Sequence, residues 1–246
     1  MTAILWLLGV LAGLWLLGVL LSRHIQGLIL LLTGRANIAT MVYDLLVLPG
    51  VVLHELSHAL VALLLGLRVL QINLFQFRSS TDPRQGEVIV TKADPLRMSI
   101  VGAAPLLCGV AVLVLLLRWL DPPTVSLNLA AFSQLWQQLR EPTTAIATYF
   151  LFAIANTMFP SEADRRAWWV VGAVLLVLGT VLLALGVRPT IPPLWVERLA
   201  AQSDQLVDAL LPVAVIDVVV LVIVLMLETL VSRIRGRRVV YRTIKP

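Results

Sequence analysis

The stretch LPGVVLHELSHALVALLLGLRV, residues 48–69, is apolar nearly throughout, yet it carries His54, Glu55 and His58 near its middle. Ionisable side chains are costly inside an apolar helix unless a partner or an ion compensates them. The stretch therefore predicts a membrane-embedded helix that contains a polar site.

The whole chain has the composition of a membrane protein. Of its 246 residues, 59% are hydrophobic, and the mean hydropathy is +0.94. Soluble domains are about 45–50% apolar, whereas this chain holds several apolar runs of the length that spans a bilayer. We expect an all-α polytopic protein with a single membrane domain over 1–246. The lone Cys108, in an apolar run, excludes an internal disulfide and is expected to be a packing residue.

Hydropathy predicts six transmembrane spans. Their approximate bounds are 3–21, 41–66, 98–120, 144–160, 168–187 and 210–231. The short apolar piece 25–34 is expected to be a separate interfacial helix. The first span lacks a basic start and a cleavage site, which indicates a retained helix rather than a cleaved signal peptide.

Basic residues predict the orientation. With the N-terminus inside, thirteen of the 19 lysine and arginine residues lie in the cytoplasmic segments 67–97 and 161–167 and in the tail. The positive-inside rule therefore places both termini in the cytoplasm, and we expect a multi-pass protein of a prokaryotic cytoplasmic membrane. The basic tail within 210–246 is expected to contact anionic lipid, so the net charge of +5 predicts no nucleic-acid partner.

Segment 67–97 has the pattern of a β-hairpin. LRVLQINLFQF, residues 67–77, alternates apolar and polar side chains with one slip of phase, and EVIVTK, residues 87–92, is rich in β-branched residues. We expect two strands beside the membrane, with an exposed edge that offers pairing to an extended peptide. A simple connector is the alternative interpretation.

His54, Glu55 and His58 form the pattern H-E-x-x-H. Residues four apart lie on one face of a helix, so both imidazoles reach a single ion. Zinc accepts histidine nitrogen and, in catalytic sites, keeps one position for a water molecule whose pKa it lowers. Glu55 is placed to act as general base without being a ligand. The pattern predicts a Zn²⁺ site, which we favour over packing or hydrogen-bonding roles for these side chains.

Other ionisable residues carry weaker signals. His24, beside Arg23 at a membrane edge, is expected to be interfacial rather than a ligand. Asp217 in the last span is expected to face a cavity or to pair with a distant arginine, without a catalytic role. Asp44 and Glu228 lie nearer the ends of their spans.

Three segments resemble the site-2 protease family of intramembrane zinc metalloproteases. The first is HELSHALVALLLGLRV, residues 54–69. The second is GEVIVTKADPLRMSIVGAAPLLCG, residues 86–109, which is similar to that family's strand and following Gly- and Pro-containing helix. The third is NTMFPSEAD, residues 156–164. The resemblance covers 41–166, about half of the chain, and implies that this part is the catalytic core.

The resemblance also implies the third zinc ligand. The family's aspartate lies eight residues after an asparagine, and Asp164 keeps that spacing from Asn156. The chain departs from the family's motif in three places, because the proline comes four residues after the asparagine, Ala163 replaces a leucine and Arg165 replaces a glycine. Glu162 is therefore the rival ligand. Asn156 is implied to orient the substrate backbone.

These observations together predict an intramembrane zinc metalloprotease. It would hydrolyse peptide bonds in or near transmembrane segments of membrane protein substrates, with Glu55 as base and His54, His58 and Asp164 as ligands. One alternative is a non-proteolytic membrane scaffold that keeps the metal site. The other is a metal-handling transporter with Asp44, Asp217 and Glu228 on its pathway.

Overall fold

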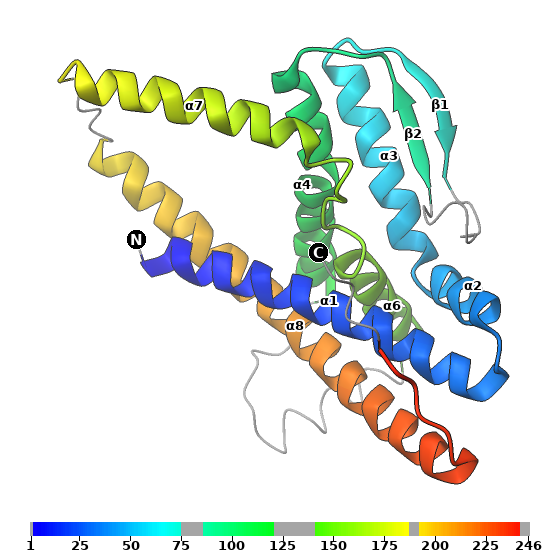
Figure 1. Cartoon of the computed structure of the whole chain (residues 1–246). Helices are drawn as coiled ribbons and strands as arrows, with labels where there is room; N and C mark the ends of the chain where they lie inside the picture. The colour runs from blue at the N-terminus through cyan, green and yellow to red at the C-terminus, as the bar shows by residue number, and fades with distance from the viewer. Residues whose placement is uncertain (1, 75–85, 121–140, 187–191, 242–246) are drawn as a thin grey trace.

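The computed structural model describes residues 2–74, 86–120, 141–186 and 192–241, which form a mostly helical chain with one small sheet (Figure 1). The helices are α1 (Thr2–Thr33), α2 (Ala36–Leu46), α3 (Leu48–Leu64), α4 (Pro95–Leu120), α6 (Pro142–Ala155), α7 (Arg166–Ala184) and α8 (Pro193–Arg235). The strands are β1 (Val69–Asn73) and β2 (Glu87–Val90).

Four helices, α1, α4, α7 and α8, are long and apolar enough to cross a membrane. The pair α2 and α3 makes a fifth span if it is counted as one element, although it is bent by 68° at Val47. Helix α6 has only 14 residues, roughly 21 Å of helix, against a hydrocarbon core of about 30 Å. The structure therefore supports a membrane-embedded protein with four or five such helices, and it does not confirm six spans.

One predicted helix boundary is wrong. The expected interfacial helix 25–34 is the continuation of α1, because the sequence has no proline there to break the helix. The predicted last span, 210–231, lies within α8, which begins earlier, at Pro193. The added part, 193–209, contains charged residues that exclude it from a hydropathy window, but its alanines, leucines and glutamines favour helix. Hydropathy marks membrane depth, whereas helix ends depend on caps and prolines.

The helices meet in two main apolar clusters. Figure 1 shows α1 lying along α8, and both helices contribute to both clusters. Fully buried leucines from four helices form the first: Leu14, Leu113, Leu151 and Leu210. Val51 of α3 packs with Phe152 of α6 in the second. These contacts fix the start of α3 against α6. Helix α7 differs, because none of its residues is buried and it projects from the body in Figure 1.

The hairpin predicted from alternation is confirmed. β1 and β2 pair antiparallel, with Asn73 opposite Glu87 and Val69 opposite Val90, and the register shifts between Val69 and Gln71. This irregularity accounts for the slip of phase in the sequence pattern. The sheet lies beside α3 in Figure 1. The expected turn between the strands, residues 78–85, lies outside the described residues.

Candidate metal centre

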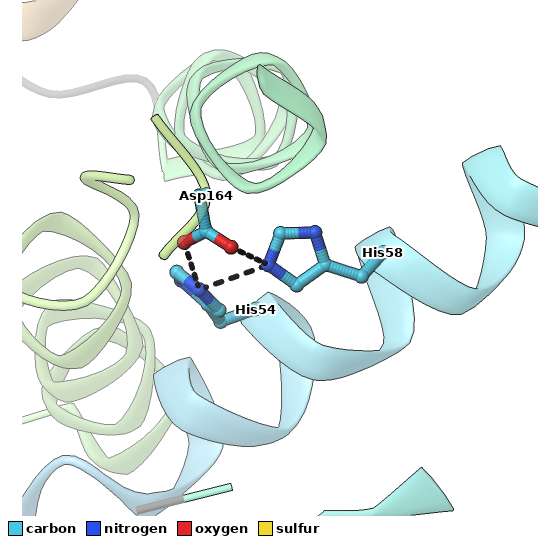
Figure 2. A group of neighbouring side chains, drawn as sticks. All are labelled: His54, His58 and Asp164. Carbon is cyan, nitrogen blue, oxygen red and sulfur yellow. Dashed lines mark hydrogen bonds and ion pairs between the residues drawn. The ribbon is translucent and has the colours of Figure 1, made fainter. Parts of the chain in front are cut away.

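His54 and His58 project from one face of α3 toward the same point (Figure 2). Their Nε2 atoms are 3.3 Å apart. Only 14% of the His54 side chain and 9% of the His58 side chain are exposed. The spacing of four residues on one helix produces this convergence without help from distant parts of the chain.

Asp164 comes to the two imidazoles from the segment between α6 and α7. Its Oδ1 atom is 3.2 Å from Nε2 of His58, and its Oδ2 atom is 3.6 Å from Nε2 of His54. Ligand atoms of the three residues all lie within 4.8 Å of one another, so the group could hold a metal ion. Glu162 lines the same cavity as these three residues, but it does not belong to the group that could hold a metal ion.

Both imidazoles are oriented by backbone carbonyl groups. Nδ1 of His54 donates to the Thr157 oxygen at 2.7 Å, and Nδ1 of His58 donates to the Val101 oxygen at 2.8 Å. A carbonyl oxygen only accepts, so each Nδ1 carries the proton. In the neutral ring, the Nε2 lone pair is then free for a metal ion. Two such lone pairs that face each other and a carboxylate are arranged as ligands of a cation.

The separation of the two imidazole nitrogens fits a tetrahedral ion. Zinc binds nitrogen and oxygen at about 2.0–2.2 Å, which places two ligands of one tetrahedral ion roughly 3.3 Å apart. The two Nε2 atoms are 3.3 Å apart. Each of them faces a different oxygen of Asp164, with Oδ1 at 3.2 Å from His58 and Oδ2 at 3.6 Å from His54. Two histidines and a carboxylate leave a fourth position open, as catalytic zinc sites do. The residues therefore fit zinc, although their geometry does not identify the metal.

The pKa of Asp164 lies below its ordinary value. Burial by itself would raise the pKa of this carboxyl group, but without a metal ion the protonated rings of His54 and His58 and a hydrogen bond from Ser161 outweigh burial. A bound cation would take the place of the two Nε2 protons. The backbone N–H of Ser161 donates to Oδ2 of Asp164 at 2.7 Å. A short turn thus presents a carboxylate rather than a carboxylic acid to the histidines.

Small residues let the 156–165 segment approach the helices. A Cβ atom on Gly102 of α4 would overlap the Asp164 carbonyl oxygen, and one on Gly50 of α3 would overlap Thr157. A third glycine, Gly109, leaves room for the Met158 side chain. The indole nitrogen of Trp168 also donates to the Ser99 oxygen at 3.1 Å, which ties the start of α7 to α4. These contacts bring Asp164 to the histidines from a distant part of the sequence.

Glu55 lies beside the three candidate ligands and is 8% exposed. Its side chain packs against Gly86, the residue directly before β2. A Cβ atom at Gly86 would overlap the Glu55 side chain and its carboxyl group. Glu55, the three candidate ligands and Gly86 line one cavity of about 1080 Å³, which also reaches Trp15, Gly18 and Asn156. A general base and a metal site therefore face the same space.

Asn156 lies at the end of α6, and its side chain does not join the candidate ligands. Its Nδ2 atom donates to the Phe152 oxygen at 2.8 Å and to Oδ1 of Asp217 at 3.1 Å. Asp217 is thus paired with an amide, and no ion pair with an arginine is found for it in the part of the chain that the structure describes. Sequence reasoning missed this pairing, since the two residues are 61 positions apart.

Sequence reasoning also missed the carbonyl groups of Thr157 and Val101, because any residue type supplies a backbone oxygen. Gly102 and Gly50 indicate in part where the 156–165 segment packs. Glycine is unfavourable inside a helix, so its presence there suggests that another part of the chain approaches closely.

Comparison of the chain with protein-family models, with curated proteins and with solved structures finds no match.

Proposed function

We propose that the chain is a zinc-dependent intramembrane endopeptidase of the site-2 protease type. It hydrolyses peptide bonds in or near transmembrane segments of membrane protein substrates. The observation that carries this proposal is the convergence of His54, His58 and Asp164 in a cavity that also holds the Glu55 carboxyl group. A purely structural metal site needs no base beside it, whereas hydrolysis does.

The residues divide the chemistry between them. A bound zinc ion supplies Lewis acidity toward the substrate carbonyl and a more acidic water. Glu55 removes a proton from the attacking water as the new C–O bond forms, and it returns that proton to the amide nitrogen as the C–N bond breaks. Because the Nδ1–H groups of His54 and His58 donate to the Thr157 and Val101 oxygens, the two Nε2 atoms would hold the ion, and neither ring would be needed as a proton carrier.

Strand β2 is the proposed platform for the substrate. Peptide bonds inside a helix are shielded by their own hydrogen bonds, so cleavage requires a locally extended substrate. Glu87, Val88 and Val90 of β2 line the cavity, which places a strand beside Glu55. An extended peptide that pairs with β2 would present its backbone to the metal site. In the proposed orientation, with both termini cytoplasmic, the site lies toward the cytoplasmic face.

The variant Glu55→Gln tests the proposed function. It keeps the size of the side chain and all three ligands, so we expect zinc content equal to wild type and a loss of cleavage of at least 100-fold, the usual contribution of a general base. Zinc is measured by elemental analysis of the purified protein. Cleavage is measured with membrane-derived peptides in proteoliposomes, and Glu197→Gln, on an exposed part of α8, serves as the matched control.

The same measurement separates the alternatives. Stoichiometric zinc without Glu55-dependent cleavage of any peptide would contradict the protease and favour a non-proteolytic scaffold. Metal flux into proteoliposomes that survives Glu55→Gln would favour a transporter.

A further inference from the structure

Helix α8 carries a buried acid that the proposed chemistry does not use. Asp217 is 1% exposed and lies in the apolar part of the helix. The Nδ2 group of Asn156 donates to its Oδ1 atom, while its Oδ2 atom has no hydrogen-bond partner among the described residues. An acidic group in a membrane-spanning segment is expensive and by default indicates function. The hydrogen-bond partner of Asp217, Asn156, lines the same cavity as the three candidate ligands.

The amide of Asn156 is fixed by its two acceptors. The Phe152 carbonyl oxygen only accepts, so the amide nitrogen rather than the amide oxygen must face it. The two hydrogens of this nitrogen go to the Phe152 oxygen and to Asp217 Oδ1. The amide oxygen then points toward Gly18 of α1, where a Cβ would come within 3.3 Å of it. Asp217 therefore holds the side chain at the end of α6 in one orientation.

The next residue of the chain holds a candidate ligand. Thr157 follows Asn156 directly, and its carbonyl oxygen accepts the 2.7 Å hydrogen bond from Nδ1 of His54. Its hydroxyl donates to the Ala153 oxygen at 2.9 Å, and Gly50 lets this turn lie against α3. The residue that Asp217 orients is therefore joined by one peptide bond to the residue whose carbonyl orients His54.

We propose that Asp217 is a positioning residue for the metal centre, acting through Asn156 and the Thr157 carbonyl on His54. The inference rests on the metal site of the proposed function, but it does not require that the site hydrolyse peptides. The imidazole of His58 is held by Val101 of α4, so Asp217 acts on one of the two histidines.

Zinc affinity and the spectrum of the cobalt form test this role in the full-length protein. Groups that directly orient a ligand change metal affinity by about 10–100-fold, and Asp217 acts one step further away, so Asp217→Leu should weaken zinc binding by about 5–10-fold. Affinity is measured by competition with a chelator. The visible absorption bands of bound Co²⁺ should shift, because they report ligand geometry. Asp217→Asn keeps an acceptor for Asn156 and should recover most of the affinity.

Controls exclude a general structural effect. Leucine suits an apolar helix better than aspartate, which offsets the hydrogen bond that Asn156 loses, so the melting temperature of metal-free Asp217→Leu should change little. Asp208→Leu changes an exposed aspartate of the same helix and should leave zinc affinity and the cobalt spectrum unchanged. Zinc affinity within twofold of wild type and an unaltered cobalt spectrum in Asp217→Leu would overturn the inference.

A second variant keeps the test decisive if Asp217→Leu does not fold. Asn156→Ala removes the other half of the pair and should weaken zinc binding and shift the cobalt bands as Asp217→Leu does. The double variant should be no weaker than either single variant, because one interaction is lost in all three. Additive losses, or an Asn156→Ala protein with wild-type metal binding, would refute the role. If wild type binds zinc but cleaves no peptide, the proposed protease fails while this inference is still decided by the metal measurements.

Discussion

Gly102 determines how closely Asp164 approaches the two histidines. A methyl group at this position would overlap the Asp164 carbonyl oxygen, and the backbone cannot yield as a flexible side chain can. We expect Gly102→Ala to displace the carboxylate and to weaken zinc binding by about tenfold or more, as the loss of a ligand-orienting contact does. Chelator competition measures the change.

Gly172→Ala is the matched control for Gly102→Ala. Gly172 also lies inside an apolar helix, but nothing surrounds the position that its Cβ would occupy. Both substitutions raise helix propensity equally, so a difference in zinc affinity reports the contact with Asp164 alone. Equal affinities in the two variants would show that the 156–165 segment adapts to the added methyl group.

The part of the site that sequence could predict is the part that one helix contains. His54, Glu55 and His58 follow from spacing on α3, because helix geometry alone relates them. Asp164 followed only from resemblance, and Glu162 stayed open as a rival, because no local rule relates residue 164 to residue 58. The structure brings Asp164, rather than Glu162, into the group that could hold a metal.

At the scale of elements, the alternating pattern predicted the hairpin well, because strand faces are a local property. The lengths of α1 and α8 could not be read from hydropathy. These two helices run beside each other, and their pairing includes polar contacts that the sequence does not reveal. Nδ1 of His24 on α1, a residue predicted to be interfacial rather than a ligand, lies 2.7 Å from Oε2 of Glu228 on α8.

Tyr241, beyond the end of α8, strengthens this pairing of helices. Its hydroxyl donates to Glu228 Oε1 at 2.7 Å, and its ring contacts His24 edge to face. We expect Tyr241→Phe to destabilise the protein by about 1 kcal/mol, the usual net value of a hydrogen bond. The measurement is the melting temperature in detergent at pH 7.

The effect of Tyr241→Phe should depend on pH. Burial, together with the hydrogen bond to Glu228, raises the pKa of the Tyr241 phenol. A raised pKa means that folding favours the protonated form, so the stabilisation is complete below the ordinary value of about 10 and is lost as pH rises above it. The difference between wild type and Tyr241→Phe should be constant from pH 7 to 9. A difference that disappears already at pH 8 would contradict the assigned hydrogen bond.

At the scale of the whole molecule, the sequence predicts six membrane crossings, whereas the structure has four or five helices of sufficient length among the described residues. Six spans with both termini inside place Arg68 and Arg237 on one side of the membrane and Glu141 on the other. Single cysteines at these positions, in a Cys108→Ser background, should react with an impermeant maleimide from opposite sides. Labelling of Glu141→Cys from the same side as Arg68→Cys would show that α4 does not cross.

The three candidate ligands come from distant parts of the sequence, so a bound ion would stabilise the fold of the whole chain. Two come from α3, and the third comes from a turn more than 100 positions later. An ion bound there would be a reversible cross-link between α3 and the 156–165 segment, and it would close a long loop. Because it binds the folded state, it adds about 2.7 kcal/mol when its free concentration is 100 times the dissociation constant.

Chelation should therefore lower the melting temperature of wild type by several degrees and leave that of Asp164→Ala almost unchanged. Equal sensitivity of the two proteins to the chelator would mean that the ion binds elsewhere. None of the residues of α7 is buried, so a metal ion held by Asp164, just before this helix, would add a second attachment beside the hydrogen bond from Trp168 to Ser99.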